Sequence, residues 1–323
     1  MTERKRSDRD HRTIMVREGD HGLPYSKGLM ANTIMMSGLS PARAYQVSQV
    51  IEDRLLDLGG GWVAADDLRR VAADVISEEA GDRYAQAYRK WQTVVHLDAP
   101  LIVLIGGGTG VGKSTISTQL AARLGVVRVI STDAIREVMK GTFSQDFMPT
   151  LYRSSFDAAD VVRAKSPRAE DALLVGFRDQ VAAVAVGVKA LIERAVTEST
   201  DVVIEGAHIV PGFIDLEAFA DRAVIVPIVI QVEDEDLHRS HFYVRAGDSR
   251  ARPMERYLAH FPNIRKIQKY IKSLALQHGV PAISNYDLDA CLASVIDHVI
   301  DRAVEAAKVH PQRRVRAVRG GSV

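Results

Sequence analysis

The feature that most constrains the fold is a glycine-rich loop, GGGTGVGKST, at residues 106–115. It follows the apolar run LIVLI at 101–105 and precedes STISTQLAARLG, which has the composition of a helix. Strand, glycine-rich loop and helix in this order form a P-loop, in which backbone amides and the helix N-terminus face a phosphate. The sequence therefore predicts a site for a nucleoside triphosphate.

Further apolar runs follow the loop and alternate with helical segments. They lie at 126–130, 201–206, 223–232 and 281–284. Runs this apolar indicate strands that are buried on both faces of a parallel sheet. We therefore expect a doubly wound α/β domain built around the P-loop strand.

Changes of composition along the chain predict four segments. Residues 1–12 are dense in charge and are expected to be a disordered arm. Residues 13–92 predict a small, mainly helical domain that begins with one short strand at 13–16. Residues 100–307 hold the α/β domain, and residues 308–323 form a basic, flexible tail.

Charge and cysteine content bound the class of protein. The formal net charge of +1 gives no overall attraction to nucleic acid or to an anionic membrane. No apolar run reaches the ~18–20 residues of a membrane span, and no signal-peptide pattern follows the charged N-terminus. A single cysteine, Cys291, excludes an internal disulfide and suits a reducing compartment. We expect a cytoplasmic protein with no membrane partner.

The P-loop residues have separate expected roles. The glycines let the backbone curl around the β-phosphate, Lys113 is expected to reach the β- and γ-phosphate oxygens, and the Ser114 hydroxyl is expected to bind Mg²⁺. The nucleotide-binding candidates are Gly107, Gly108, Thr109, Gly110, Val111, Gly112, Lys113, Ser114 and Thr115.

The next apolar run ends in STDAIR, which places Asp133 and Arg136 at the start of a helix. We expect this strand to lie beside the P-loop strand, so that Asp133 can hydrogen-bond an acceptor hydroxyl or a Mg²⁺-bound water, and Arg136 can hold an anionic acceptor. The alternative is that Asp133 only caps the helix. The chain has no N-K-x-D motif, which argues against a guanine-dependent switch. Glu205 ends the run at 201–206.

A basic segment precedes the last predicted strand. Residues 237–272 contain nine lysines and arginines and two acidic residues, which is typical of a lid that binds anions. Arg245, Arg250 and Arg252 are expected in a mobile loop near the triphosphate. Other members of the segment are expected to be ordinary surface residues. Arg265, Lys269 and Lys272 are expected on a solvated helix face, and His238 and His241 are expected at the surface and not as metal ligands.

Together these motifs identify a resemblance. GGGTGVGKST, ISTDAIREVM, IEGAHIVPG and the arginine-rich segment resemble the 2-phosphoglycerate kinases, which make 2,3-bisphosphoglycerate from ATP and 2-phosphoglycerate. The resemblance implies ATP phosphates on the loop, the acceptor near Asp133 and Arg136, and γ-phosphate stabilisation by the lid arginines. It also implies that Glu205 and His208 face the same cleft, where Glu205 orients Mg²⁺ through water.

The segment before the P-loop resembles another family. IMVREGDHGLPYSKGLMANTIMMSGL and the helix after it resemble an ATP-cone, a small nucleotide-sensing domain. Arg17 is present, but the fuller basic-Asp-Gly pattern of that family is not. Nucleotide binding by this segment is therefore left open.

The leading interpretation is a cytoplasmic, Mg²⁺-dependent kinase. It would pass the γ-phosphate of ATP to a hydroxyl of a small phosphorylated metabolite, with 2-phosphoglycerate as the first candidate. An inositol phosphate or a nucleotide sugar would suit the basic lid equally well. The alternative from another class is a nucleotide-sensing regulator whose basic tail binds nucleic acid. A homo-oligomer is left open by the sequence.

Overall fold

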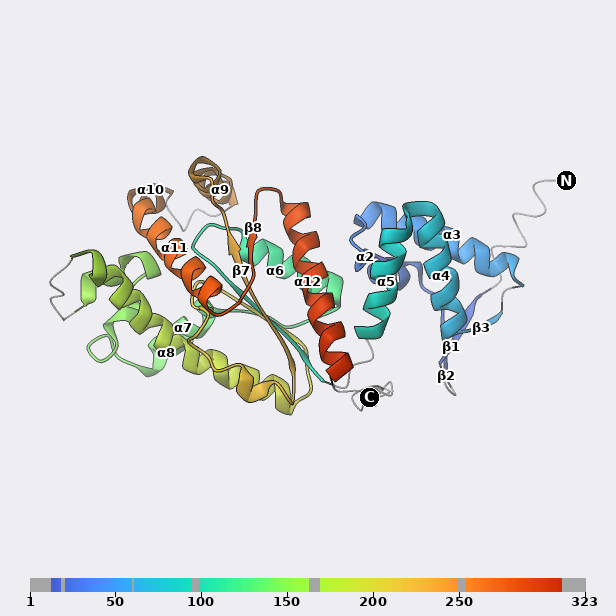
Figure 1. The fold of residues 1–323 in the computed structure, drawn as a ribbon, viewed down its shortest axis with the longest axis horizontal. Helices are drawn as coiled ribbons and strands as arrows, with labels where there is room; N and C mark the ends of the chain where they lie inside the picture. Colours follow the sequence, from blue (N-terminus) through green and yellow to red (C-terminus); the bar gives the residue numbers. More distant parts are fainter. Residues whose placement is uncertain are drawn as a thin grey trace. The chain divides into compact units, whose positions relative to one another are not determined.

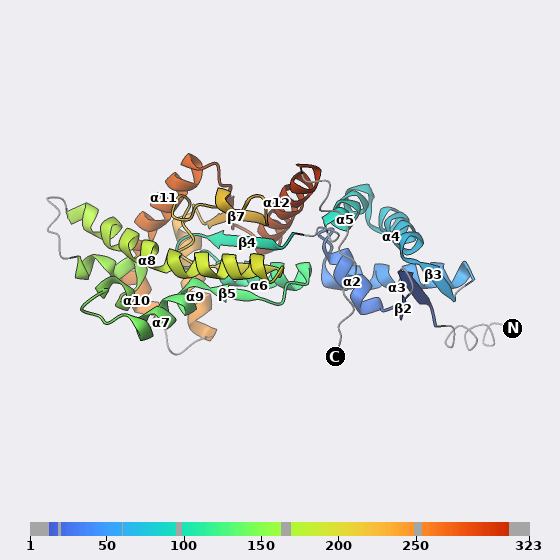
Figure 2. The same cartoon turned by 90° about the horizontal axis from the view of Figure 1, so that it is seen from below.

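The structure is a computed structural model that describes residues 13–18, 21–59, 61–94, 99–162, 169–248 and 254–309. Backbone contacts divide the chain near residue 96 into two compact units, which we describe separately. Figures 1 and 2 show their elements in two views. The predicted arm at 1–12 and most of the predicted tail lie outside the described residues.

The first unit combines helices with a small sheet. Its helices are α2 (Lys27–Met35), α3 (Pro41–Asp57), α4 (Ala65–Ala80) and α5 (Asp82–Val94). Its strands are β1 (Met15–Glu18), β2 (His21–Pro24) and β3 (Trp62–Ala64), in the order β2-β1-β3. The sequence predicted one strand. The other two were missed because HGLP and WVA are too short to show a strand pattern.

The longest helix of this unit, α3, begins where the sequence provides a capping serine and a proline. The Ser40 hydroxyl accepts a hydrogen bond from the Arg43 amide at 3.4 Å, and Pro41 occupies the first turn, where its missing N–H costs nothing. The helix buries Val47 and Ile51 completely, against Ile34 of α2 among others. The unit therefore has an apolar core of its own.

The second unit is built on a five-stranded sheet in the order β5-β6-β4-β7-β8. The strands are β4 (Leu101–Gly106), β5 (Val129–Ser131), β6 (Val202–Glu205), β7 (Val224–Gln231) and β8 (Ala282–Ser284). Every pairing between them is parallel. The five predicted strands and the α/β class are confirmed.

One expected neighbour relation is wrong. The strand before Asp133, β5, does not pair with the P-loop strand, because β6 lies between them. Glu205 on β6 is level with Ile105 of β4 on one side and with Ser131 of β5 on the other. Glu205 is therefore the carboxylate that ends the strand next to the P-loop strand.

Helices cover the sheet. They are α6 (Lys113–Leu124), α7 (Thr132–Thr142), α8 (Ala169–Thr197), α9 (Glu235–Asp248), α10 (Met254–Ala259), α11 (Phe261–Gln277) and α12 (Leu288–Val309), with short 3₁₀ helices η1 (Pro149–Tyr152), η2 (Ser155–Val161) and η3 (Glu217–Phe219). None of the described helices combines the length and the apolar composition that a membrane span requires.

Both faces of the sheet are buried, which explains the continuous apolar runs. Ile102 and Leu104 of β4 belong to one core cluster with Val188 of α8, and Figure 2 shows α8 running along the strands. Val103 and Ile105 point to the opposite face and have no exposed surface. The P-loop follows β4, and Ser131 and Glu205 end the parallel strands β5 and β6, so all three lie at the same edge of the sheet, where α/β proteins bind ligands.

Candidate active site

The P-loop joins β4 to α6 and leads to a buried lysine. Positive φ angles at Gly107, Gly110 and Gly112, of 138°, 85° and 92°, curl the loop over the start of α6. Lys113 is the first residue of that helix and is only 9% exposed. Its Nζ donates to the Gly108 carbonyl oxygen at 2.6 Å. The loop therefore presents a cation and a helix N-terminus to the same space.

That space is a cavity of about 220 Å³. It brings together predicted residues from three separate motifs: the P-loop, the start of α7 and the end of β6. Residues of η2 and α10 complete the wall. The lining side chains and backbone come from Thr109, Gly110, Lys113, Ser114, Ser131, Asp133, Arg136, Ser154, Ser155, Phe156, Glu205, Gly206, Ala207, Arg256 and Tyr257.

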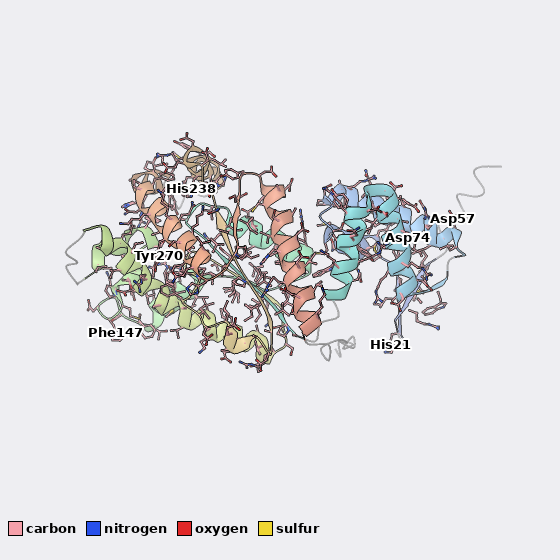
Figure 3. All side chains as sticks on the ribbon, viewed as in Figure 1. His21, Asp57, Asp74, Phe147, His238 and Tyr270 are labelled. Carbon is pink, nitrogen blue, oxygen red and sulfur yellow. The ribbon has the colours of Figure 1, made fainter. Side chains whose placement is uncertain are left out.

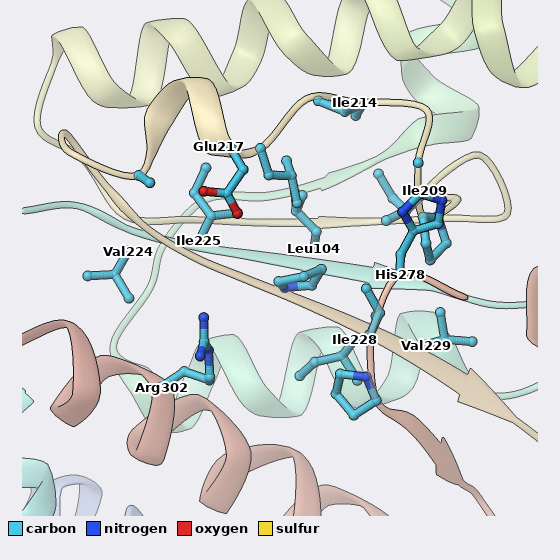
Figure 4. A pocket seen from close by; sticks show the side chains of 18 of the residues that line it. Leu104, Ile209, Ile214, Glu217, Val224, Ile225, Ile228, Val229, His278 and Arg302 are labelled. Carbon is cyan, nitrogen blue, oxygen red and sulfur yellow. The ribbon is translucent and has the colours of Figure 1, made fainter. Parts of the chain in front are cut away.

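A larger cavity lies elsewhere in the second unit. Its walls come from β7, the crossover around η3, the end of α11 and one face of α12, and Figure 4 shows its mostly apolar lining. No P-loop residue lines it. The residues that the sequence predicts to bind nucleotide line the smaller cavity, so we take the smaller cavity as the candidate active site.

Ser114 and Glu205 meet at the edge of the sheet. The Ser114 hydroxyl donates to Glu205 Oε1 at 2.9 Å, and Glu205 is 7% exposed. A hydroxyl and a carboxylate are oxygen ligands of the kind that Mg²⁺ uses at nucleotide sites, where phosphates and water supply the remaining positions. Within the described residues, no group of three or more His, Cys, Asp and Glu side chains could hold a metal alone. The pair fits Mg²⁺ that arrives with a nucleotide.

Asp133 lies in the cavity wall without capping its helix. Ser131 caps α7 by accepting a hydrogen bond from the Ala134 amide at 3.2 Å, so the capping alternative for Asp133 is wrong. The Asp133 side chain is 62% exposed, and its Oδ1 lies 3.6 Å from Nε of Arg136. A carboxylate that is exposed to the cavity is free to meet an acceptor hydroxyl.

Arg136 is held more firmly than the sequence suggested. Its side chain is 14% exposed, and Nη1 donates to the carbonyl oxygens of Leu151 at 2.8 Å and Arg153 at 3.3 Å. These contacts tie α7 to η1 and to the turn that carries Ser154. The guanidinium thus has a fixed position in the wall before any acceptor binds.

His208 does not line the cavity, although the resemblance implied that it would. It is 2% exposed, with Nδ1 2.8 Å from the Thr132 hydroxyl and Nε2 3.1 Å from Gln180 Oε1. Since the Gln180 oxygen can only accept, Nε2 carries the proton and Thr132 donates to Nδ1. Burial lowers the pKa of His208 to about 4, so the ring is neutral.

The turn before His208 is shaped around the same threonine. Gly206 has a φ of 153°, and a Cβ at this position would overlap the Thr132 side chain. Gly206 therefore lets the end of β6 approach the start of α7. His208 and Gly206 both contact Thr132, which directly precedes Asp133. We therefore regard them as residues that position Asp133.

The basic segment is helical where the structure describes it. Arg245 belongs to α9 and not to a loop, while Arg250 and Arg252 lie outside the described residues. Lys269 and Lys272 are exposed, as expected. Arg265 is buried at 9% exposure and donates to the Val232 and Glu233 carbonyl oxygens, both at 2.6 Å, so its assignment to a solvated face is wrong.

Among the described side chains of this segment, one arginine lines the cavity, and the sequence did not single it out. Arg256 of α10 lines the wall and forms an ion pair with Asp157 of η2, which is 6% exposed. Nδ1 of His260 lies 3.2 Å from the other oxygen of the same carboxylate. Among the side chains that the structure describes, two guanidinium groups therefore line the cavity, Arg136 from α7 and Arg256 from α10.

The chain is similar to named proteins along most of its length. The 2-phosphoglycerate kinase of Methanothermobacter thermautotrophicus is 38% identical over 286 residues, which cover 88% of this chain and 93% of the relative. That of Methanopyrus kandleri is 35% identical and covers 92% of this chain and 90% of the relative. That of Pyrococcus horikoshii is 34% identical, with 91% and 96% covered.

No family model matches the chain. Among solved structures, a gluconokinase from Sinorhizobium meliloti aligns with a TM-score of 0.35 at 12% identity, covering 67% of this chain and 98% of that one, a likeness too weak to argue from. The three relatives establish the family of this chain, because each is more than 30% identical to it over nearly its full length. The chain belongs to the 2-phosphoglycerate kinase family.

Proposed function

We propose that this chain transfers the γ-phosphoryl group of ATP to the free hydroxyl of 2-phosphoglycerate, which gives 2,3-bisphosphoglycerate. The observation that carries the proposal is the one cavity in which Lys113 and Ser114 of the P-loop meet Asp133 and Arg136. The names of the relatives support the acceptor, since each is called a 2-phosphoglycerate kinase.

At the nucleotide end, the P-loop amides and the ammonium of Lys113 bind the phosphates. The Ser114 hydroxyl would hold Mg²⁺, with Glu205 behind it to orient the ion directly or through water. When bound, Mg²⁺ neutralises charge on the β- and γ-phosphates. Because Glu205 is buried, its carboxylate keeps one position during this step.

At the acceptor end, two arginines face an acceptor with two anionic groups. 2-Phosphoglycerate carries a phosphate and a carboxylate, and guanidinium groups bind both in a fork-like geometry. Arg136 and Arg256 come from different helices, α7 and α10, and the Ser154 and Ser155 residues line the same cavity. A neutral sugar would offer these guanidinium groups no anionic partner beyond the Asp133, Glu137 and Asp157 carboxylates that already pair with them. We retain Arg245, Arg250 and Arg252 as proposed ligands of the γ-phosphate.

In the transfer step, the acceptor hydroxyl oxygen bonds to the γ-phosphorus while the bond to the β–γ bridging oxygen breaks, and ADP leaves. The proton of the hydroxyl passes to the Asp133 carboxylate, which acts as general base or orients the hydroxyl. Charge on the transferred group is balanced by Lys113 and the arginines. Positioning and electrostatic stabilisation thus supply most of the rate enhancement.

We further propose that the protein acts in the cytoplasm and that its first unit is a separate, ATP-cone-like domain that modulates the kinase. The apolar core of that unit supports independent folding. The single buried cysteine, Cys291, is compatible with a reducing compartment.

The test is an acceptor panel with the full chain, ATP and Mg²⁺. It compares 2-phosphoglycerate with 3-phosphoglycerate, which has the same groups at exchanged positions, and with an inositol phosphate and a nucleotide sugar. We expect acceptor-dependent ADP release that is largest with 2-phosphoglycerate, and a bisphosphate product by ³¹P NMR. Preference for another acceptor would overturn the substrate, and salt-dependent nucleic-acid binding without turnover would favour a regulator.

A further inference from the structure

Side chains from two other parts of the second unit, α9 and the residue after β8, bond to the P-loop. Four consecutive carbonyl oxygens of the loop each accept a hydrogen bond from a different side chain. The donors are Lys113 Nζ to Gly108 at 2.6 Å, His238 Nε2 to Thr109 at 2.8 Å, His241 Nδ1 to Gly110 at 2.9 Å, and Asn285 Nδ2 to Val111 at 2.9 Å.

The histidines of this set were expected to be ordinary surface residues, and the structure overturns that expectation. His238 has no exposed surface, and His241 is half-buried. Both lie on α9, three residues apart, so they project from one side of the helix. Figure 3 labels His238 in this helix.

The protonation state of His238 follows from its partners. A carbonyl oxygen only accepts, so Nε2 must carry the hydrogen that bonds to Thr109. Nδ1 is then an acceptor, and it receives Nη1 of Arg265 at 3.3 Å. Burial and the neighbouring Arg265 charge lower the pKa of His238 to about 4, which keeps the ring neutral. His238 is therefore a neutral donor held by a buried arginine.

Packing supports the same contact. The Phe242 ring lies against Gly110, where a Cβ would overlap it, and Gly110 has a φ of 85°. Phe242 is 2% exposed and stacks on the His238 ring with 5.5 Å between ring centroids. The helix α9 thus touches the loop with both apolar and polar side chains.

In a planar trans peptide, the C=O of one residue and the N–H of the next point in opposite directions. A carbonyl of Thr109 held outward by His238 therefore aims the Gly110 amide inward, toward the cavity. In the same way, the bond from His241 to the Gly110 carbonyl aims the Val111 amide inward. The two histidines set the direction of two amides that would bind phosphate.

We propose that His238 and His241 are positioning residues for nucleotide binding, which hold the P-loop carbonyls outward so that its amides face the phosphates. The inference rests on the proposed function only in taking ATP and ADP as the nucleotides. It assigns a role to two side chains that touch neither substrate, and it makes α9 part of the nucleotide site.

The test exploits the different donor atoms of the two rings. A Gln amide nitrogen reaches about as far as a ring Nε2, and an Asn amide nitrogen about as far as a ring Nδ1. His238→Gln and His241→Asn should therefore keep the bond to the loop, whereas His238→Asn and His241→Gln should lose it. Affinity for Mg²⁺-ADP is measured by isothermal titration on the full chain, with melting temperatures recorded for each variant.

We expect the matched variants to bind within about twofold of the unchanged chain and the mismatched variants to bind about threefold to tenfold more weakly, the range of one hydrogen bond. Tyr243→Ala is the control, because this side chain is on α9 and is 57% exposed. Equal losses for Asn and Gln at each position, or no loss in any variant, would overturn the proposal.

Two features keep the test decisive. If the His238 variants fail to fold, His241→Asn and His241→Gln give the same comparison of donor atoms, because His241 is only half-buried. The titration needs no acceptor, so it is independent of the substrate. A chain that binds ADP but does not phosphorylate 2-phosphoglycerate would contradict the proposed function and still decide the role of the histidines.

Discussion

Ser114 and Glu205 are 91 positions apart in the sequence, and the Ser114 hydroxyl donates to the Glu205 carboxylate at 2.9 Å. The parallel pairing of β4 and β6 produces this contact, because it aligns Ile105 with Glu205 at the edge where the P-loop begins. The pair therefore depends on strand order, which places a carboxylate next to the first turn of α6.

The first prediction concerns this pair. Glu205→Gln should weaken the apparent affinity for Mg²⁺ in the kinase reaction by about 10- to 100-fold, because the amide lacks the charge that orients the ion and its water. Nucleotide binding without Mg²⁺ should change little. The measurement is initial rate against Mg²⁺ concentration at saturating ATP.

Asp221→Asn serves as its control, since this carboxylate is 78% exposed and lies outside the cavity. An unchanged Mg²⁺ dependence in Glu205→Gln would show that the carboxylate only fixes the Ser114 rotamer.

The second prediction concerns Asp133. Asp133→Asn should lower kcat by roughly 10²–10⁴, the range for loss of a positioned general base, while ADP affinity changes little. Stability should change by less than about 1 kcal/mol, because Ser131 supplies the helix cap and Asp133 is exposed. The check is steady-state kinetics with both substrates, together with chemical unfolding.

Glu137→Gln is the matched control, since Glu137 is on the same helix, is 58% exposed and also pairs with Arg136. Parallel loss of ADP binding and turnover in Asp133→Asn would assign the carboxylate to the nucleotide site and remove it from acceptor chemistry.

The third prediction concerns Arg136, which has a binding role and a structural role. Arg136→Lys keeps the charge but cannot reproduce the fork that faces the acceptor and the Leu151 carbonyl. We expect the KM for 2-phosphoglycerate to rise about 10- to 100-fold, with a smaller change in the KM for ATP.

The melting temperature of Arg136→Lys separates the two roles, because a loosened η1 lowers it whether or not an acceptor binds. Equal increases in both KM values would show that Arg136 acts on the cavity as a whole.

The strands and the P-loop of the second unit were predictable because their signals are local. The runs at 101–105 and 202–204 are apolar throughout since both faces of their strands are buried, and the P-loop motif occupies consecutive residues. Strand order has no such signal. Nothing in the run before Asp133 shows that β6 separates it from β4, so the expected adjacency was wrong.

Contacts between side chains and distant backbone were also beyond the sequence. His238 and His241 bond to carbonyls that are 129 and 131 positions away, and any residue type offers a carbonyl. Their only local sign is a spacing of three residues, with Phe242 beside them, in a segment for which no helix was predicted. Arg265 was misassigned for the same reason, since its partners are the Val232 and Glu233 carbonyls.

The last prediction follows from the neutral, buried His208. Its pKa of about 4 lies below the ordinary value of 6.5, mainly because burial opposes the charge. Lys113 and Arg136 lower it further, and Asp133 acts in the opposite direction. Between pH 6.5 and 4 the unfolded chain therefore binds a proton at this residue that the folded chain does not, and stability is lost as the pH falls through this window.

The size of this loss is at most about 3 kcal/mol from His208, and His238, with a similar pKa, adds to the slope. His208→Gln retains an amide that can bond to Gln180 or Thr132 but does not titrate. Its free energy of unfolding, measured by urea titration at pH 7 and pH 4.5, should differ between the two conditions by less than that of the unchanged chain. His278→Gln, at an exposed position, should leave the difference as it was. A His208→Gln variant that lost as much stability on acidification as the unchanged chain would show that the ring already binds its proton in the folded state.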